Sequence, residues 1–173
     1  MKLQLDEYTT RTLETKGHSM NSNEIIMEAI GEVFTDTPND QISSNRKKLI
    51  SEIEIYPKYQ KSLEGLNSYS HIFVLFWMNR KTDNLTLMEH PRGNLAISKT
   101  GVLAGRGRNH PNPIGLAVCE ILNTTKTGLR VKQLDAYNRT KVIDIKPYDD
   151  YDVVSEPKIP DWLKLSRTSR PGL

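Results

Sequence analysis

Short apolar runs separated by glycine, proline and asparagine fill the middle of the chain. The run Leu49–Tyr56 alternates, with Ile53 and Ile55 on one face and acidic residues on the other, as a half-buried strand does. His71–Met78 is apolar and aromatic almost throughout, which predicts a central strand covered on both faces. The hydrophobic pattern therefore favours strands over long helices.

Five further runs have the length of strands: Ile30–Phe34, Leu85–Met88, Ile114–Leu122, Leu129–Leu134 and Val142–Ile145. Pro57 opens a short helix that ends at Leu63, with Gly65 just beyond it. Many short strands at this spacing, with hardly a helix among them, are typical of a barrel or sandwich and not of a Rossmann sheet. We predict a mainly β protein, built as a single compact β-barrel-like domain with short helices.

Polar segments flank this body on both sides. Residues 1–23 show little periodicity and form either a native extension or residues added ahead of a true start at Met20. The stretch 155–173 is rich in Pro, Lys and Arg and has the composition of a tail. We expect the barrel domain to occupy residues 24–154.

The charge balance and the cysteine and histidine content exclude several classes of protein. Lys and Arg exceed Asp and Glu by 24 to 21, an excess too small to establish a nucleic-acid partner. The four histidines lack ligand spacing, so no metal is expected. The single cysteine, Cys119, excludes an internal disulfide and faces the same way as Ala117, so we predict that it is buried and inert.

Nothing in the sequence predicts a membrane or secretory protein. The apolar runs fall well short of the roughly 18 residues that a membrane-spanning helix needs. The N-terminal segment has no apolar core of the kind that a signal peptide requires. We therefore expect a cytoplasmic protein.

The most unusual stretch is the loop Gly101–Gly115, along which Arg106, Arg108 and His110 alternate. Two prolines fix the backbone on either side of Asn112 and present its amide from a stiff turn. Rigid loops of this kind often hold small ligands, although a surface loop with solvated arginines fits the spacing equally well.

Two glycines of this loop, Gly105 and Gly107, leave the backbone free to adopt positive φ and let a ligand approach closely. They do not form a dinucleotide fingerprint, because His110 stands at the third glycine position and no long helix follows.

A second cluster runs from Leu134 to Tyr148 and has the pattern of strand, turn and strand. Asn138 and Arg139 are predicted to make the turn. Asp144 and Lys146 are predicted to project from the same face as Val142, and their alternative role is simply to pair on the sheet surface.

Three motifs, in this order and at this spacing, resemble those of the TsaA-like (TrmO) family of methyltransferases. They are Ser70-His-Ile-Phe-Val-Leu-Phe-Trp, the loop with its Pro-Asn-Pro-Ile-Gly ending, and Leu134-Asp with the later Asp-Ile-Lys-Pro-Tyr. The likeness extends from about Ile30 to Tyr151. The family's patterns are similar to Ser-His-x-Trp-Val-Leu-Phe, Ala-Thr-Arg-Ser-x-x-Arg-Pro-Asn-Pro-Ile-Gly and Val-x-Asp-Ile-Lys-Pro-Tyr.

The resemblance implies a β-barrel methyltransferase that acts as a homodimer, with S-adenosyl-L-methionine bound near the subunit interface. It implies N6-methylation of threonylcarbamoyladenosine in the tRNA anticodon loop. Carried over position by position, the cofactor contacts fall on Gln41, Asn79, Arg80, Arg106, Leu116, Asp135, Ala136, Tyr137 and Asn138.

The implied chemistry suits residue types present in these motifs. The cofactor's methionine carboxylate needs a cation such as Arg106. Asn112 and Asp144 are candidates to assist loss of the N6 proton. For contact with the tRNA substrate the candidates are Arg108, His110, Arg139 and Lys146.

The departures from the family pattern fall on ligand-facing loops. Gly105 replaces Thr, Gly107 replaces Ser, His110 replaces Arg, and Asn79-Arg80 replaces a polar pair that is often His-Gln. These departures leave three functions open. These are tRNA methylation, methylation of a small molecule on the same fold, and a non-catalytic sensor that binds an adenosine ligand.

Overall fold

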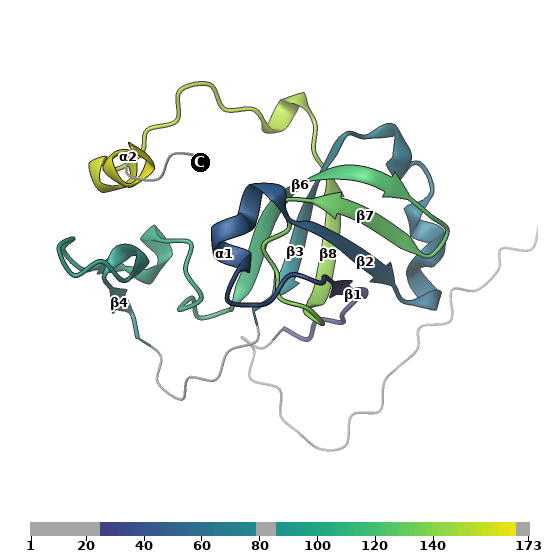
Figure 1. The fold of residues 1–173 in the computed structure, drawn as a ribbon, viewed down its shortest axis with the longest axis horizontal. Coiled ribbons are helices and arrows are strands. Elements are labelled where there is room, and N and C mark those ends of the chain that lie inside the picture. The colour runs from purple at the N-terminus through teal and green to yellow at the C-terminus, as the bar shows by residue number, and fades with distance from the viewer. Residues whose placement is uncertain (1–24, 79–85, 169–173) are drawn as a thin grey trace, which may run out of the picture.

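Six antiparallel strands close into a barrel in the computed structural model, which describes residues 25–78 and 86–168 (Figure 1). Around the barrel the order is β1-β2-β7-β6-β3-β8. The strands are β1 (Gly31–Phe34), β2 (Ile50–Ile55), β3 (His71–Trp77), β6 (Ile114–Thr124), β7 (Gly128–Lys132) and β8 (Lys141–Pro147). This confirms the mainly β, barrel-like prediction.

Helical structure is short. The α-helices are α1 (Ile42–Asn45) and α2 (Asp161–Thr168), and the 3-10 turns are Arg46–Lys48, Pro57–Leu63, Leu66–Ser68, Pro91–Gly93, Val102–Ala104 and Asp150–Asp152. The predicted helix after Pro57 is confirmed in its bounds, and it is a 3-10 helix. Gly65 follows it with φ of 84°, a conformation that glycine adopts without strain.

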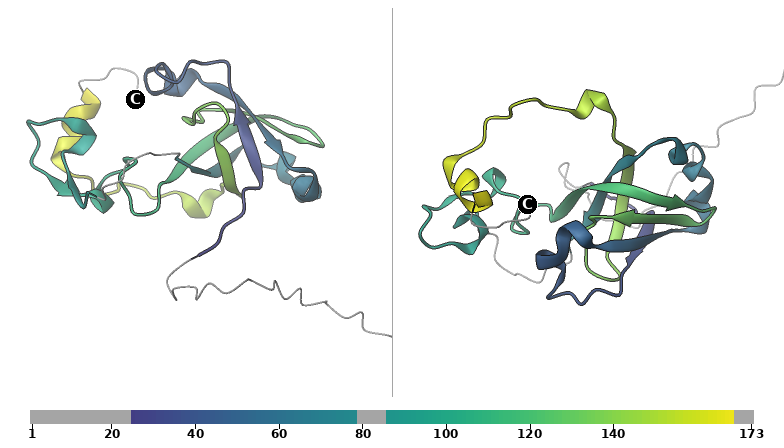
Figure 2. Two further views of the ribbon diagram at one scale, coloured as in Figure 1. Left: turned by 90° about the horizontal axis from the view of Figure 1, so that it is seen from below. Right: turned by 45° about the horizontal axis from the view of Figure 1, so that its top comes forward.

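A second, two-stranded sheet stands apart from the barrel. It pairs β4 (Met88–Glu89) with β5 (Thr100–Gly101), and in all three ribbon views it lies on the same side of the barrel as α2 (Figures 1 and 2). The prediction of a body strand over Leu85–Met88 is therefore wrong. Leu85 lies outside the described residues, and Leu87 and Met88 are exposed, so this run adds nothing to the core.

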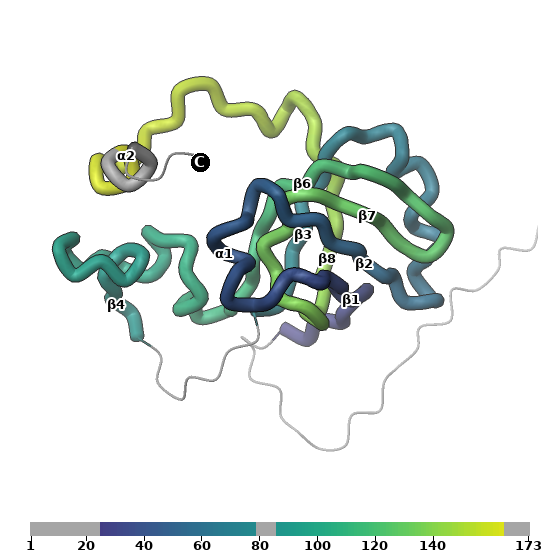
Figure 3. The backbone as a smooth tube through the Cα atoms, viewed as in Figure 1, coloured from purple at the N-terminus to yellow at the C-terminus, as the bar shows by residue number. Residues whose placement is uncertain are grey.

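The chain after β8 leaves the barrel as an extended arm and leads to α2, as the tube in Figure 3 shows. Helix α2 falls within the stretch predicted from composition to be a tail. No helix in the described part of the chain is both long and apolar enough to cross a membrane.

Side chains at alternate positions along the strands point inward and fill the barrel interior. Ile53 and Ile55 of β2 are buried, as predicted, while Glu52 and Glu54 face outward. Strand β3 behaves in the same way rather than being covered on both faces, because a barrel strand turns only one face inward. Its outer-face residues His71, Phe73 and Leu75 are only partly buried, and Trp77 at its end is 36% exposed.

A bulge in β8 changes which side chains share a face. Strand β8 pairs Asp144 with Leu75 and Val142 with Phe76, so Ile143 is an extra residue without a partner on β3. Val142 is consequently buried while Asp144 faces outward. The prediction that Asp144 shares a face with Val142 is wrong, because the inserted residue reverses the alternation between them.

We predict that Gly128→Ala lowers the free energy of unfolding by about 1–3 kcal/mol, the usual range for overpacking. A Cβ at Gly128 would lie 2.1 Å from the backbone oxygen of Ile53 on the paired strand, which has no room to move. Urea unfolding with an unchanged m-value measures the effect.

Gly101→Ala is the matched control, because a Cβ there meets nothing within 4 Å. Its stability should stay within about 0.5 kcal/mol of the parent. Equal stability of the Gly128 and Gly101 variants would contradict the tight β2–β7 contact.

Candidate functional site

The predicted ligand loop is tied to the barrel through Arg106. Its Nη2 donates a hydrogen bond to the backbone oxygen of Leu116, two residues into β6, at 2.9 Å. Two of the predicted cofactor contacts therefore lie together, and both residues are exposed. This hydrogen bond holds the Arg106 guanidinium against the outer side of β6.

The loop's glycines do not adopt the positive φ expected from the sequence. Neither Gly105 nor Gly107 has positive φ; in the described part of the chain, positive glycine φ occurs at Gly65 and Gly93. A Cβ at Gly107 would instead lie 2.9 Å from Oε1 of Glu89 on β4. The glycine makes room for a carboxylate of the protein, and this carboxylate also accepts a hydrogen bond from the Asn109 amide.

His110 bends back into its own loop. Its Nε2 lies 3.2 Å from the backbone oxygen of Gly105, so the ring closes the turn around Arg106. The predicted substrate residue Arg108 is exposed, as is the predicted catalytic residue Asn112. The backbone oxygen of Asn112 accepts a hydrogen bond from Ile114 at 2.7 Å, which fixes the stiff turn that leads into β6.

A second group of predicted contacts follows β7. Asp135 forms an ion pair with Nε of Arg46 at 3.1 Å, while its neighbour Ala136 is buried and offers only its backbone. Gln41 immediately precedes α1, and the turn after this helix carries Arg46. Sequence reasoning missed Arg46, because only the folded chain brings the turn after α1 next to the segment after β7.

The turn predicted at Asn138 and Arg139 is confirmed. Thr140 donates its backbone N–H to the oxygen of Tyr137 at 3.2 Å, and Arg139 has φ of 67°. The amide oxygen of Asn138 accepts a hydrogen bond from the backbone of Thr35 at 3.2 Å, which attaches the turn to the end of β1.

The two cations of this turn meet a buried carboxylate that the sequence did not reveal. Nζ of Lys141 and Nε of Arg139 lie 3.0 Å and 3.4 Å from Oε1 of Glu32, whose side chain is 11% exposed. Arg139 also lies over the ring of Phe34 at 4.8 Å. Hydrogen bonds to Tyr56 and Glu32 raise the pKa of Lys141.

The predicted catalytic carboxylate, Asp144, is paired. Its Oδ2 lies 2.8 Å from Nζ of Lys146, and the pKa of Lys146 is raised by this hydrogen bond. The two residues do share the outer face of β8, as predicted. The catalytic role of Asp144 and the substrate role of Lys146 stay predictions.

Two of the predicted cofactor residues, Asn79 and Arg80, lie outside the described residues. Within the described ranges no cluster of three or more His, Cys, Asp and Glu side chains could hold a metal ion.

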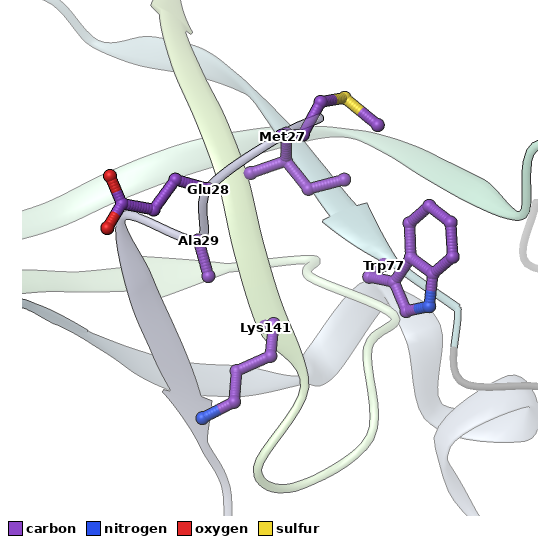
Figure 4. A pocket seen from close by; sticks show the side chains of 6 residues that line it. Met27, Glu28, Ala29, Trp77 and Lys141 are labelled. Carbon is purple, nitrogen blue, oxygen red and sulfur yellow. The ribbon is translucent and has the colours of Figure 1, made fainter. Parts of the chain in front are cut away.

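Two surface hollows lie on the described part of the chain. One, of about 120 Å³, is lined by Met27, Glu28, Ala29, Trp77, Lys141 and Ile143 (Figure 4). The other is a broad depression between the Pro57–Leu63 turn and the β6–β7 hairpin. The described cofactor candidates line neither of these two hollows.

Comparison with known proteins gives consistent matches. The model of a family described as the tRNA-methyltransferase O N-terminal domain matches residues 32–152. An S-adenosyl-L-methionine-binding protein of Archaeoglobus fulgidus is 38% identical over 128 residues, which are 72% of this chain and 89% of the relative. A solved structure described as "Crystal structure of TrmO" aligns with a TM-score of 0.64 and 25% identity, and the alignment covers 79% of this chain and 63% of that one.

Longer relatives match over a smaller part of their length. A probable S-adenosyl-L-methionine-binding protein of Archaeoglobus fulgidus is 39% identical over 65% of this chain, and the match spans only 30% of that relative. A tRNA (adenine(37)-N6)-methyltransferase of Rattus norvegicus is 33% identical over 64% of this chain and 26% of its own length.

We predict that Cys119 does not react with thiol reagents in the folded protein. Burial raises its pKa to about 12, and the nearby Asp135 carboxylate adds to the rise. At pH 8 roughly one thiol in 10,000 is then ionised. Ellman's reagent should label nothing in buffer and one thiol per chain in urea.

The same shift predicts a loss of stability in alkali. Below the ordinary thiol pKa of 9.0 both states keep the proton, and above it only the unfolded chain releases it. The free energy of unfolding attributable to Cys119 therefore falls as the pH rises from 9, and Cys119→Ser should remove this part of the pH dependence. Rapid labelling of the folded chain at pH 8 would contradict the assignment.

Proposed function

The chain belongs to the family of the tRNA-methyltransferase O N-terminal domain, and on that premise we propose that it is an S-adenosyl-L-methionine-dependent methyltransferase. We propose that its acceptor is N6 of threonylcarbamoyladenosine in the tRNA anticodon loop. The observation that carries the proposal is the Arg106–Leu116 contact, which presents a cation at the start of β6 inside the region matched by the family model.

The residues of the site suit the cofactor's polar groups. Arg106 spends one of its N–H donors on Leu116, and in the described part of the chain its other donors remain for a carboxylate. Asp135 is 27% exposed beside Arg46 and would accept from ribose hydroxyls. Tyr137 is 41% exposed and offers a ring for an adenine to stack on.

The bound cofactor would supply an activated methyl group, and the protein's task is to align donor and acceptor and exclude water. Orientation of this kind supplies roughly 7 kcal/mol or more of a reaction barrier. The exposed Asn112 amide would accept a hydrogen bond from the N6 proton and orient that nitrogen. Asp144 would act as the base, with its Oδ2 held 2.8 Å from Nζ of Lys146.

The tRNA backbone would lie against the cations around the site. Arg108 and Lys146 are exposed, and Arg139 is 61% exposed beside Glu32. Each phosphate contact contributes to affinity without regard to sequence and adds to its salt dependence. A cytoplasmic location suits this substrate.

Methylation of a small molecule is the second candidate. His110 turns inward to Gly105 rather than outward toward a large substrate. Gly107 accommodates Glu89, which places a carboxylate under the loop where a phosphate would be repelled.

The outer wall of the barrel supports a homodimer. Leu116 and Val118 on β6 are 45% and 40% exposed, and they pair with Leu75 and Phe73 on β3 to form one apolar face. An apolar face on a sheet is covered more often than it is left in water. A second copy on this face would also lie beside the proposed cofactor site at Leu116.

We predict that Val118→Glu converts the dimer into single chains of 19.8 kDa, because a charge in the centre of the apolar face would be desolvated. Sedimentation equilibrium measures the mass, with Arg130→Glu on the outer face of β7 as the control. A monomeric parent protein would contradict the dimer.

We predict that Arg106→Ala weakens binding of S-adenosyl-L-methionine at least tenfold, because a charge-assisted hydrogen bond is worth about 1.5–3 kcal/mol. Isothermal titration calorimetry measures the affinity. Arg130→Ala removes an exposed arginine from β7 and should bind as the parent does. Full affinity in the Arg106 variant would refute the site.

Turnover on total tRNA with methyl-labelled cofactor tests the acceptor. Label should enter tRNA and should disappear when the tRNA comes from cells that lack threonylcarbamoylation. Label in a small-molecule extract but not in tRNA would replace the first acceptor by the second. If the chain binds the cofactor but labels neither tRNA nor the small-molecule extract, it is a sensor and not a methyltransferase.

A further inference from the structure

In the closed barrel the strand pairing is shortest along the seam between β1 and β8. These strands pair at only two positions, Gly31 with Val142 and Glu32 with Lys141. Ile30 adds one further hydrogen bond to Val142, at 2.8 Å, and the chain before it is not paired with β8. On the other side of β8, Ile143 is the bulged residue with no partner on β3. The hollow of about 120 Å³ lies where these two irregularities meet.

The walls of this hollow are apolar and its charged groups are held at the rim. Figure 4 shows the indole of Trp77 on one side, while the Glu28 carboxylate and the Lys141 ammonium lie on the side away from it. The carboxylate accepts a hydrogen bond from the Tyr59 hydroxyl at 2.6 Å and pairs with Lys58.

The Lys141 ammonium is held in a similar way. It lies 3.0 Å from Glu32 and 2.9 Å from the Tyr56 hydroxyl. The space beside the indole is thus left to Met27, Ala29 and Ile143. A ligand in this space would meet the indole and alkyl groups, with polar groups only at its edge.

Trp77 joins this hollow to the proposed cofactor site. It is the last residue of β3 and pairs with Ile114, so Leu116 is its diagonal neighbour on the outer face of β6. Diagonal side chains on a sheet lie within reach of an aromatic ring. A ligand stacked on the indole would therefore lie beside a cofactor bound at Arg106 and Leu116.

We propose that this hollow receives the methyl acceptor as a planar nucleobase stacked on Trp77. This inference rests on the proposed methyltransferase function. An apolar cavity of about 150 Å³ takes a single benzene ring, so a hollow of about 120 Å³ takes the edge of a base and leaves sugar and phosphate outside. Stacking on an aromatic side chain is indifferent to whether the base belongs to RNA or to a free nucleoside.

The first test compares Trp77→Ala with Trp77→Phe in methyl transfer. The alanine variant should raise the acceptor KM about 5- to 150-fold, the range that alanine substitution of a stacked aromatic gives per base. Phenylalanine keeps a ring and should recover most of this loss. Tyr69→Ala, two residues before the opposite end of β3 and 41% exposed, is the aromatic control and should leave KM unchanged.

The affinity for S-adenosyl-L-methionine separates this inference from the function on which it rests. Parent and Trp77 variants should bind the cofactor equally, since Trp77 is not among its proposed contacts. A parent chain that binds no cofactor would overturn the function itself. Normal cofactor binding with an unchanged acceptor KM in Trp77→Ala would overturn the stacking site alone.

A second test observes the indole directly. In a Trp162→Phe background Trp77 is the remaining tryptophan, and its fluorescence should be quenched by a stacked base. Saturating S-adenosylhomocysteine blocks the cofactor site during titration with total tRNA or with adenosine. Quenching by tRNA alone assigns the hollow to a base in RNA, and quenching by adenosine assigns it to a free nucleoside. If neither tRNA nor adenosine quenches the fluorescence, the proposal is overturned. This test keeps Trp77 in place, so it does not require a Trp77 variant to fold.

Discussion

Closure of the six-stranded ladder is the constraint from which the rest of the molecule follows. Each strand has two neighbours, so its side chains divide into one inward and one outward set. The inward set leaves no usable interior: Val33, Val74, Cys119, Val131 and Val142 are all 0% exposed. A barrel filled in this way has no room for a ligand, so binding must take place on its wall and at its strand ends.

The alternating pattern predicted most of the strands because inward and outward residues differ so sharply in polarity. Strand β2 shows this directly, with isoleucines inside and acidic residues outside. The pattern failed where apolar residues are not buried and where a bulge shifts the register. Leu87 and Met88 are apolar but exposed, and the bulge at Ile143 reverses the faces of β8 without any change in composition. Composition does not reveal a register shift, because the inserted residue looks like every other strand residue.

Local parts of the candidate site were predictable and its long-range partners were not. The Asn138–Arg139 turn and the stiff entry to β6 depend on neighbouring residues, and both appear as expected. Glu32, by contrast, meets Lys141 across 109 positions, and Arg46 meets Asp135 only because the turn after α1 lies beside the segment after β7. Such pairs combine common surface residue types, so nothing in the sequence distinguishes them from solvated charges.

The partners of the positive side chains decide which cations remain available to a ligand. By sequence Arg139, Lys141, Lys146 and Arg106 are equivalent positive charges, but Glu32 compensates the first two and Asp144 the third. Arg106 differs, because in the described chain its guanidinium donates to a neutral backbone oxygen, which orients it without cancelling its charge. A positive charge that is positioned but not neutralised is what recognition of an anionic group requires. Glu32 thus compensates the two cations beside the Asn138–Arg139 turn, and the proposed recognition of the cofactor's carboxylate falls to Arg106 in the loop before β6.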